Sequence, residues 1–193
     1  MLGEPLHRLT VQQYERMVES GILGPDDRVE LLEGLLLKKM TKKPPHRIAT
    51  HRARQHLAER IPRGWYVDTQ EPIVTADSEP EPDVAVIRGT TEDYADANPG
   101  AEHVGLVVEV ADVTLLRDRR LKARIYARAS IPHYWIVNLA EHVVEAYSEP
   151  SGATASPSYG RQVSYHEGEE LDLVLDGTKV ARVQVNELLP KKK

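Results

Sequence analysis

Two carboxylates stand inside apolar segments of this sequence, where an acidic side chain needs a physical reason. Glu109 lies in GLVVEVAD (105–112), a run typical of a buried strand, and Asp83 opens the apolar run DVAVI (83–87). An unpaired buried carboxylate costs several kcal/mol or takes up a proton. Glu109 therefore either reaches water at the end of its strand or faces a positive group.

Lys122 is the positive side chain best placed to face Glu109. At about 100° per residue, a helix over 115–129 gathers its apolar residues in one stripe, and Asp118 and Lys122 fall inside that stripe. The opposite face carries Arg117, Arg120, Arg124 and Arg128. Because the helix follows the strand of Glu109 and packs over it, Lys122 can approach that carboxylate. The alternatives are a half-buried Asp118–Lys122 ion pair, or a lysine stem that passes along the core to water.

Two carboxylates at adjacent strand ends, with a lysine nearby, would form a site for a hard cation. Mg²⁺ prefers oxygen ligands, and Asp83, Glu109 and the Val110 carbonyl would supply them, with Mn²⁺ as the alternative ion. The ion would polarise a phosphate and lower the pKa of a bound water. A lysine held among carboxylates stays charged and can orient the attacking water. For Asp83 alone, the alternative is a solvated turn residue at a strand entrance.

The spacing of apolar and turn residues predicts the elements that would position this site. Helices are expected over 11–20, after the capping-box spacing of Thr10 and Gln13, and over 46–61 and 115–129. A hairpin is expected over 28–40, with its turn near Glu33 and Gly34. Strands are expected over 65–74, 82–89, 105–111, 134–138 and 142–147, followed by a β-rich segment over 163–185.

This order of elements predicts one α/β domain over 1–193, with a mixed central sheet flanked by helices. It divides into an N-terminal helix and hairpin (1–45), a core (46–138) and a β-rich C-terminal extension (139–193). The strand–helix–strand run over 105–138 predicts a right-handed crossover between parallel strands. The absence of GxGxxG and GxxxxGK[ST] leaves dinucleotide and nucleoside triphosphate binding without support. The absence of cysteine excludes disulfides, thiolate metal sites and a cysteine nucleophile.

The charge distribution favours a nucleic-acid partner although the net charge of −5 argues against one. From Lys38 to Gly64 there are nine Lys or Arg residues against one acid, and from Thr114 to Ser130 six against one. The segment between them, 65–109, carries eleven acids and one base. Acidic metal ligands between basic walls would give this layout, and two solvated helix faces would give it as well.

Several motifs together resemble the PD-(D/E)XK nucleases and, more closely, the Uma-type family of restriction-endonuclease-like proteins. They are VELLEG (29–34), PPHR (44–47), EPDVAVI (81–87), LVVEVAD (106–112), the Asp118–Lys122–Tyr126 ladder and IPHYWIVN (131–138). The resemblance implies a restriction-endonuclease-like core and Mg²⁺-dependent phosphodiester hydrolysis. By motif, Asp83 and Glu109 would be metal ligands and Lys122 the catalytic lysine. Glu30 would assist the metal or its waters, and Gln70 would lie near the site.

Two positions depart from the usual pattern. The ExK motif would place its lysine at position 111, which is Ala111 here, so the lysine has moved to the helix as Lys122. Position 112, often Ser in the family, is Asp112, which would add a ligand or cap the following helix. His46, His51 and His56 are spaced by five residues and cannot converge on one ion from a helix. A surface or half-buried position is expected for His46; the alternative, from its place near the apolar stripe of Ala49, Ala53 and Leu57, is an approach to the active site.

The sequence therefore predicts a Mg²⁺-dependent endonuclease that hydrolyses DNA phosphodiesters. Asp118 and Tyr126 are expected to support the catalytic groups, and nucleic-acid contacts are expected from Lys42, Lys43, Arg47 and Arg52. A homodimer is expected by family analogy and because duplex cleavage needs two sites. A cytoplasmic location without a membrane partner is expected, since no apolar run approaches ~20 residues. Two alternatives stay open: a non-catalytic nucleic-acid-binding or protein-interaction module, and a metal-dependent phosphoesterase for small substrates.

Overall fold

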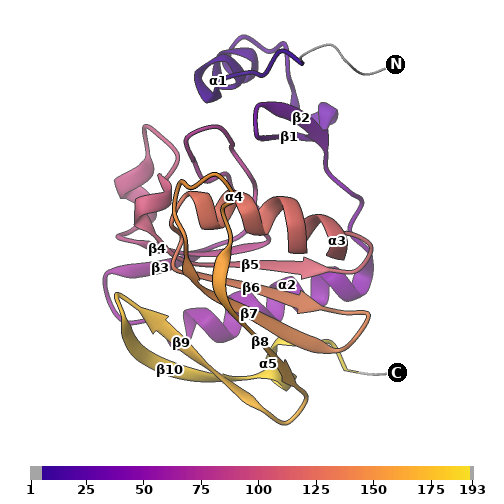
Figure 1. The fold of residues 1–193 in the computed structure, drawn as a ribbon, viewed down its shortest axis with the longest axis vertical. Helices are drawn as coiled ribbons and strands as arrows, with labels where there is room; N and C mark the ends of the chain where they lie inside the picture. The colour runs from indigo at the N-terminus through magenta and orange to yellow at the C-terminus, as the bar shows by residue number, and fades with distance from the viewer. Residues whose placement is uncertain (1–5, 192–193) are drawn as a thin grey trace.

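A mixed six-stranded sheet forms the centre of the protein, whose computed structural model describes residues 6–191 (Figure 1). The strands follow the order β3-β4-β5-β6-β7-β8 and span Trp65–Asp68, Val84–Arg88, Val104–Ala111, His133–Asn138, Val143–Pro150 and Tyr159–His166. Neighbours are antiparallel except β5 and β6, which run parallel as the sequence predicts. Within 6–191, no helix has both the length and the apolar character that a bilayer crossing requires.

Helices cover both faces of this sheet, so the predicted α/β class is confirmed (Figure 1). Helix α2 (Pro44–Ala58) packs on the face formed by Val108, Val110 and their neighbours, together with the hairpin of β9 (Glu170–Leu175) and β10 (Thr178–Gln184) and the short helix α5 (Val185–Leu188). The other face, which includes Val107 and Ala111, is covered by a continuous helical run. That run consists of α3 (Leu115–Arg117), the π-helical turn η4 (Asp118–Lys122) and α4 (Ala123–Arg128).

The N-terminal helix and hairpin form as predicted. Helix α1 (Val11–Glu19) begins at a capping box between Thr10 and Gln13. Strands β1 (Val29–Leu32) and β2 (Leu35–Lys38) pair around Glu33 and Gly34, whose φ angles of 49° and 74° are those of a tight hairpin turn. Short 3₁₀ helices fill three connections: η1 (Pro25–Asp27), η2 (Thr91–Tyr94) and η3 (Ala101–His103).

Several predicted boundaries were wrong. The strand expected over 142–147 continues to Pro150, and the first strand expected within 163–185 begins at Tyr159. The strand expected over 65–74 stops at Asp68, because Gln70 adopts a positive φ of 60° and donates its backbone N–H to Pro82 in a loop. The helix expected over 46–61 spans Pro44–Ala58, since proline is well suited to the first helical turn.

Three of the four arginines on the face that the 100° spacing assigns to solvent bind acidic residues, and Arg120 is the exposed one. The β1–β2 hairpin lies over this run and supplies acidic partners (Figure 1). Arg117 Nη1 lies 3.7 Å from Glu30 Oε1, and Arg124 Nη2 lies 2.6 Å from Glu33 Oε2. Arg128 also binds Glu33. The arginines therefore attach the hairpin to the helix and bring Glu30 to the end of the sheet.

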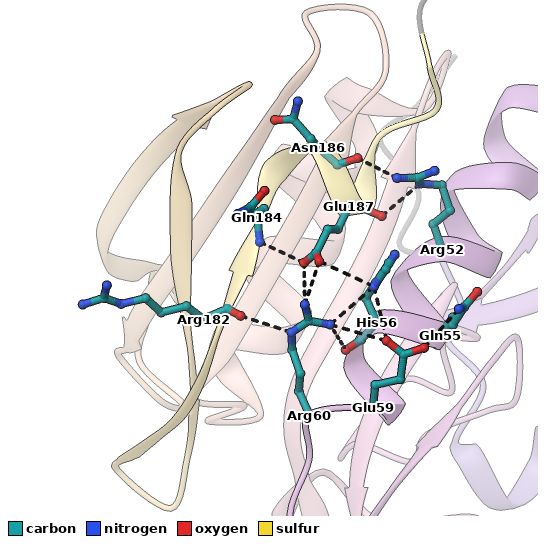
Figure 2. Close-up of polar contacts among 9 residues, drawn as sticks. All are labelled: Arg52, Gln55, His56, Glu59, Arg60, Arg182, Gln184, Asn186 and Glu187. Carbon is teal, nitrogen blue, oxygen red and sulfur yellow. Dashed lines mark hydrogen bonds and ion pairs between the residues drawn. The ribbon is translucent and has the colours of Figure 1, made fainter.

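The C-terminal segment is fastened to α2 by a polar network (Figure 2). Arg52 donates to the backbone carbonyls of Glu187 and Asn186 at 3.0 Å and 2.7 Å. Arg60 donates to both carboxylate oxygens of Glu187 at 2.7 Å and 2.9 Å. These contacts hold α5 against α2, where Val185 and Leu188 join the same buried cluster as Ala53 and Leu57.

Candidate active site

The predicted catalytic residues and metal ligands line one pocket at the end of the sheet, where β4 begins and β5 ends. Its walls come from both helical layers, from the β1–β2 hairpin and from the loop that follows it. The lining includes Glu30, Lys42, His46, Asp83, Glu109, Val110, Arg117, Asp118 and Lys122. Because β4 and β5 are antiparallel, the start of one strand and the end of the other meet at the same edge. Asp83 and Glu109 thus come together although 26 residues separate them.

Lys122 is the positive group that faces the buried carboxylate of Glu109. Its ammonium lies 2.8 Å from Glu109 Oε1 and 3.4 Å from Glu30 Oε2, and its side chain is only 4% exposed. Tyr126 donates its hydroxyl to the same Glu109 oxygen at 2.7 Å. The Asp118–Lys122–Tyr126 ladder therefore faces the sheet, as the helical spacing predicts, with Asp118 also buried.

A π-helical turn carries this ladder. The backbone N–H of Ala123 donates to the carbonyl of Asp118, five residues earlier, in place of the usual four. Such turns widen a helix locally and occur frequently at functional sites. Here the turn spans Asp118 to Lys122, so the helix is locally wound to present both charged side chains to the end of β5.

Asp83 is held through both of its carboxylate oxygens. Oδ2 accepts the backbone N–H of Val110 at 2.9 Å and lies 3.1 Å from His46 Nε2. Oδ1 lies 2.9 Å from the ammonium of Lys42, whose side chain is 35% exposed. The histidine comes from α2 on one face of the sheet, and Lys122 comes from the helix on the other face. The two helical layers thus meet at this carboxylate pair.

The electrostatics of the site follow from four buried acids around one buried lysine. Burial raises the pKa of Glu109, and the nearby Asp83 raises it further, while Lys122 opposes the rise. Burial alone would lower the pKa of Lys122, but the carboxylates of Glu109 and Glu30 outweigh it, so the amine stays charged. Burial also raises the pKa of Asp118.

Asp83 and Tyr126 keep the protonation states that their contacts require. Burial by itself would raise the pKa of Asp83, but His46 and Lys42 outweigh it and lower the pKa, so the carboxylate is ionised. Burial and the adjacent Glu109 raise the pKa of Tyr126 well above its usual value, so its hydroxyl remains a donor.

The oxygen donors at the pocket suit a hard divalent cation. No group of three or more His, Cys, Asp or Glu side chains within residues 6–191 is gathered as a metal cage. Mg²⁺ does not need such a cage, because it commonly binds one or two carboxylates and keeps several waters. The Val110 N–H reaches Asp83, and the carbonyl of a strand residue points to the same edge as its N–H. Asp83 Oδ1 already accepts a cation, the ammonium of Lys42, from the pocket side.

The remaining predicted residues take different places. Lys43 lines the pocket and lies 3.3 Å from Asp112, and Arg47 is exposed on the first turn of α2. Arg52 faces away from the pocket, where it binds the carbonyls of α5 (Figure 2). Gln70 is exposed and does not line the pocket.

Two pocket residues, His46 and Arg117, were not among the site residues predicted from the sequence, although an approach of His46 to the site was the alternative considered for it. His46 approaches Asp83, and its position near the apolar stripe of α2 was the available signal. Arg117 was placed among the solvated arginines, yet it lines the pocket beside Glu30, and its buried Nε has no hydrogen-bond partner among the described residues. Arg117 is covered because the β1–β2 hairpin lies over it, and the helical spacing alone cannot reveal that contact.

Comparisons with known proteins bear on the family and the fold of the chain. A search of curated proteins found no match. A crystal structure from Anabaena variabilis ATCC 29413, described as a "putative nuclease belonging to DUF820", is similar to this chain with a TM-score of 0.69 and 14% sequence identity. The similarity covers 93% of this chain and 97% of that one, so the two share a fold. The family model Uma2, described as "Putative restriction endonuclease", matches residues 11–181. The chain therefore belongs to the Uma2 family.

Proposed function

We propose that the protein is a divalent-metal-dependent endonuclease that hydrolyses DNA phosphodiester bonds. The observation that carries the proposal is the buried ammonium of Lys122, held 2.8 Å from Glu109 beside Asp83 in one solvent-accessible pocket. A buried lysine among carboxylates is costly for a fold, which favours a chemical role over a structural one. Membership of the Uma2 family and the nuclease-like fold support the same conclusion.

Each side chain has a distinct task in the proposed reaction. Asp83, Glu109 and the Val110 carbonyl would hold Mg²⁺ or Mn²⁺, which when bound polarises the phosphate and acidifies a coordinated water. Lys122 would direct an N–H to the attacking water or to the phosphate oxygen that gains charge. Glu30 shares the Lys122 ammonium at 3.4 Å and would keep it aimed at the pocket.

The basic wall of the pocket would bind the DNA backbone. Lys42 and Lys43 line the pocket from the loop before α2, and Arg47 is exposed one turn further along. Lysine and arginine contacts to phosphates give affinity that falls steeply with salt and carries little sequence information. Arg52 is excluded from this wall because its guanidinium binds the carbonyls of α5.

The proposal includes a homodimer, since cutting both strands of a duplex needs two sites. Light scattering on the eluted protein, with and without a DNA duplex, measures the mass directly. A monomer in both conditions would remove this part of the proposal and leave single-strand nicking as the expected activity.

The test is cleavage of supercoiled plasmid and of single-stranded DNA with Mg²⁺, with Mn²⁺ and with a chelator. We expect metal-dependent nicked or linear product from the wild type. Lys122→Met and Asp83→Asn should reduce the rate to background, while Lys179→Met, on the distant β9–β10 hairpin, should cut normally. Circular dichroism must show that the inactive variants are folded.

Three results would contradict the proposal in different ways. Cutting at wild-type rate by Lys122→Met would remove this lysine from the chemistry. Salt-dependent DNA binding without any metal-dependent product would favour a non-catalytic nucleic-acid-binding module. Hydrolysis of bis(p-nitrophenyl) phosphate but of no nucleic acid would favour a phosphoesterase for small substrates.

A further inference from the structure

His46 is a largely covered polar side chain at the pocket to which the proposed reaction assigns no task. It stands in the first turns of α2, and its side chain is 11% exposed. Its Nε2 lies 3.1 Å from Asp83 Oδ2. The other buried residues of α2 are Ala49, Ala53 and Leu57, which pack on the sheet, and Thr50. His46 differs from the apolar residues of this helix because its imidazole contacts the proposed metal ligand Asp83.

The two oxygens of Asp83 have different surroundings. Oδ2 is turned into the protein, where it meets the Val110 N–H at 2.9 Å and His46 Nε2 at 3.1 Å. Oδ1 is turned towards the pocket, where the ammonium of a half-exposed lysine, Lys42, lies 2.9 Å away. The interior contacts therefore fix which oxygen is presented to a cation in the pocket.

The hydrogen bonding of the imidazole suits this task. The Thr50 hydroxyl, one turn along α2 and only 5% exposed, lies 3.4 Å from His46 Nδ1. With the hydroxyl donating to Nδ1, the ring carries its proton on Nε2 and donates it to Asp83. Thr50, His46 and Asp83 then form a chain in which each group donates to the next.

We infer that His46 is a positioning residue, which fixes Asp83 through Oδ2 so that Oδ1 faces the divalent ion of the proposed nuclease. The inference rests on the proposed function, because it concerns the metal ligand of that reaction. Groups that orient a metal ligand without touching the metal typically change metal affinity by roughly 10–100-fold when they are removed. Without His46, Oδ2 would keep only the Val110 N–H, and the orientation of the carboxylate would be less firmly fixed.

The experiment measures Mn²⁺ binding by calorimetry and by electron paramagnetic resonance, without DNA. His46→Ala should weaken Mn²⁺ binding by roughly 10–100-fold. His46→Gln should restore most of the affinity, because its amide can accept from Thr50 and donate to Asp83 in the same order. His51→Ala, an exposed histidine on the same helix, is the matched control and should bind Mn²⁺ as the wild type does. Urea unfolding of each variant separates loss of the fold from loss of the ligand geometry.

The outcomes separate this inference from the proposed function. Equal Mn²⁺ affinity in the wild type and His46→Ala would overturn the inference while leaving the nuclease proposal intact. A loss that His46→Gln does not restore would overturn it as well, in favour of a direct imidazole–metal bond. Loss and rescue of Mn²⁺ binding in a protein that cuts no DNA would support the inference and refute the nuclease. A wild type that binds no divalent ion would overturn both.

Discussion

Replacing Lys122 with methionine should destabilise the metal-free protein strongly at pH 8. The ammonium lies 2.8 Å from Glu109 and 3.4 Å from Glu30. At an effective dielectric constant of about 20, these two contacts are worth roughly 6 and 5 kcal/mol before desolvation is counted. Burying the ammonium cancels much of that sum, and removing one member of a buried ion pair typically costs about 3–5 kcal/mol. Methionine fills a similar volume, so the loss reports on charge and not on packing.

The same variant should recover stability as the pH falls. Burial already raises the pKa of Glu109 in the wild type, and losing Lys122 removes the main group that opposes this rise. At a pH above the ordinary glutamate pKa, Glu109 is ionised in the unfolded variant but keeps its proton in the folded variant, up to its raised pKa. Stability is therefore lost as the pH rises through this window and regained as it falls. The difference from the wild type should be smaller at pH 5.5 than at pH 8.

The assay is urea unfolding followed by circular dichroism at both pH values, in the presence of a chelator. Lys39→Met is the matched control, because it removes the half-exposed partner of Glu81 at the rim of the same pocket. It should cost no more than about 1 kcal/mol at either pH, as exposed ion pairs generally do. A Lys122→Met protein as stable as the wild type at pH 8, or one whose loss is the same at both pH values, would refute the charge-compensation argument.

Three further changes follow from particular contacts. Lys42→Ala should bind Mn²⁺ more tightly than the wild type, because the variant leaves Asp83 Oδ1 without its ammonium partner; unchanged Mn²⁺ affinity by calorimetry would contradict this. The variant should also bind DNA more weakly when Ca²⁺ replaces Mn²⁺, because a proposed phosphate contact is lost. Arg52→Ala should lose about 1–3 kcal/mol in urea unfolding, since two charged hydrogen bonds to α5 disappear, with DNA affinity unaltered in a filter-binding assay. Gly34→Ala should cost about 1–3 kcal/mol, because the residue has a φ of 74° and its new Cβ would meet Arg8 Cβ at 2.6 Å; a melting temperature equal to that of the wild type would refute it.

The sequence was sufficient for the parts of the site that depend on regular spacing. Alternation along β5 places Glu109 on the side opposite Val108 and Val110, and the apolar stripe of the following helix includes Lys122. The stripe is broad enough that the π-helical turn, which the 100° spacing ignores, does not move Lys122 out of it. The parallel pairing of β5 and β6 follows from the same strand–helix–strand pattern.

The parts that were missed depend on contacts between segments distant in sequence. His46 reaches Asp83 only because α2 packs on one particular face of the sheet, and the helix itself does not specify that face. Arg117 leaves the solvated face because the hairpin of residues 29–38 folds over it. The sequence does not distinguish Arg52 from its basic neighbours, because its partner, the carbonyl of Asn186, lies 134 residues further along the chain.

The wide turn at Asp118–Lys122 contains one residue more than a regular α-helical turn, which makes the helix tolerant of a deletion at this point. Excising Arg120, an exposed residue within it, would leave the Ala123 N–H four residues after the Asp118 carbonyl, so the segment would close into regular α-helical winding. The residues beyond the cut would keep their facing, and Tyr126 would still reach Glu109. The same deletion within the regular α-helical part of the run would rotate everything beyond it by about 100° around the helix axis.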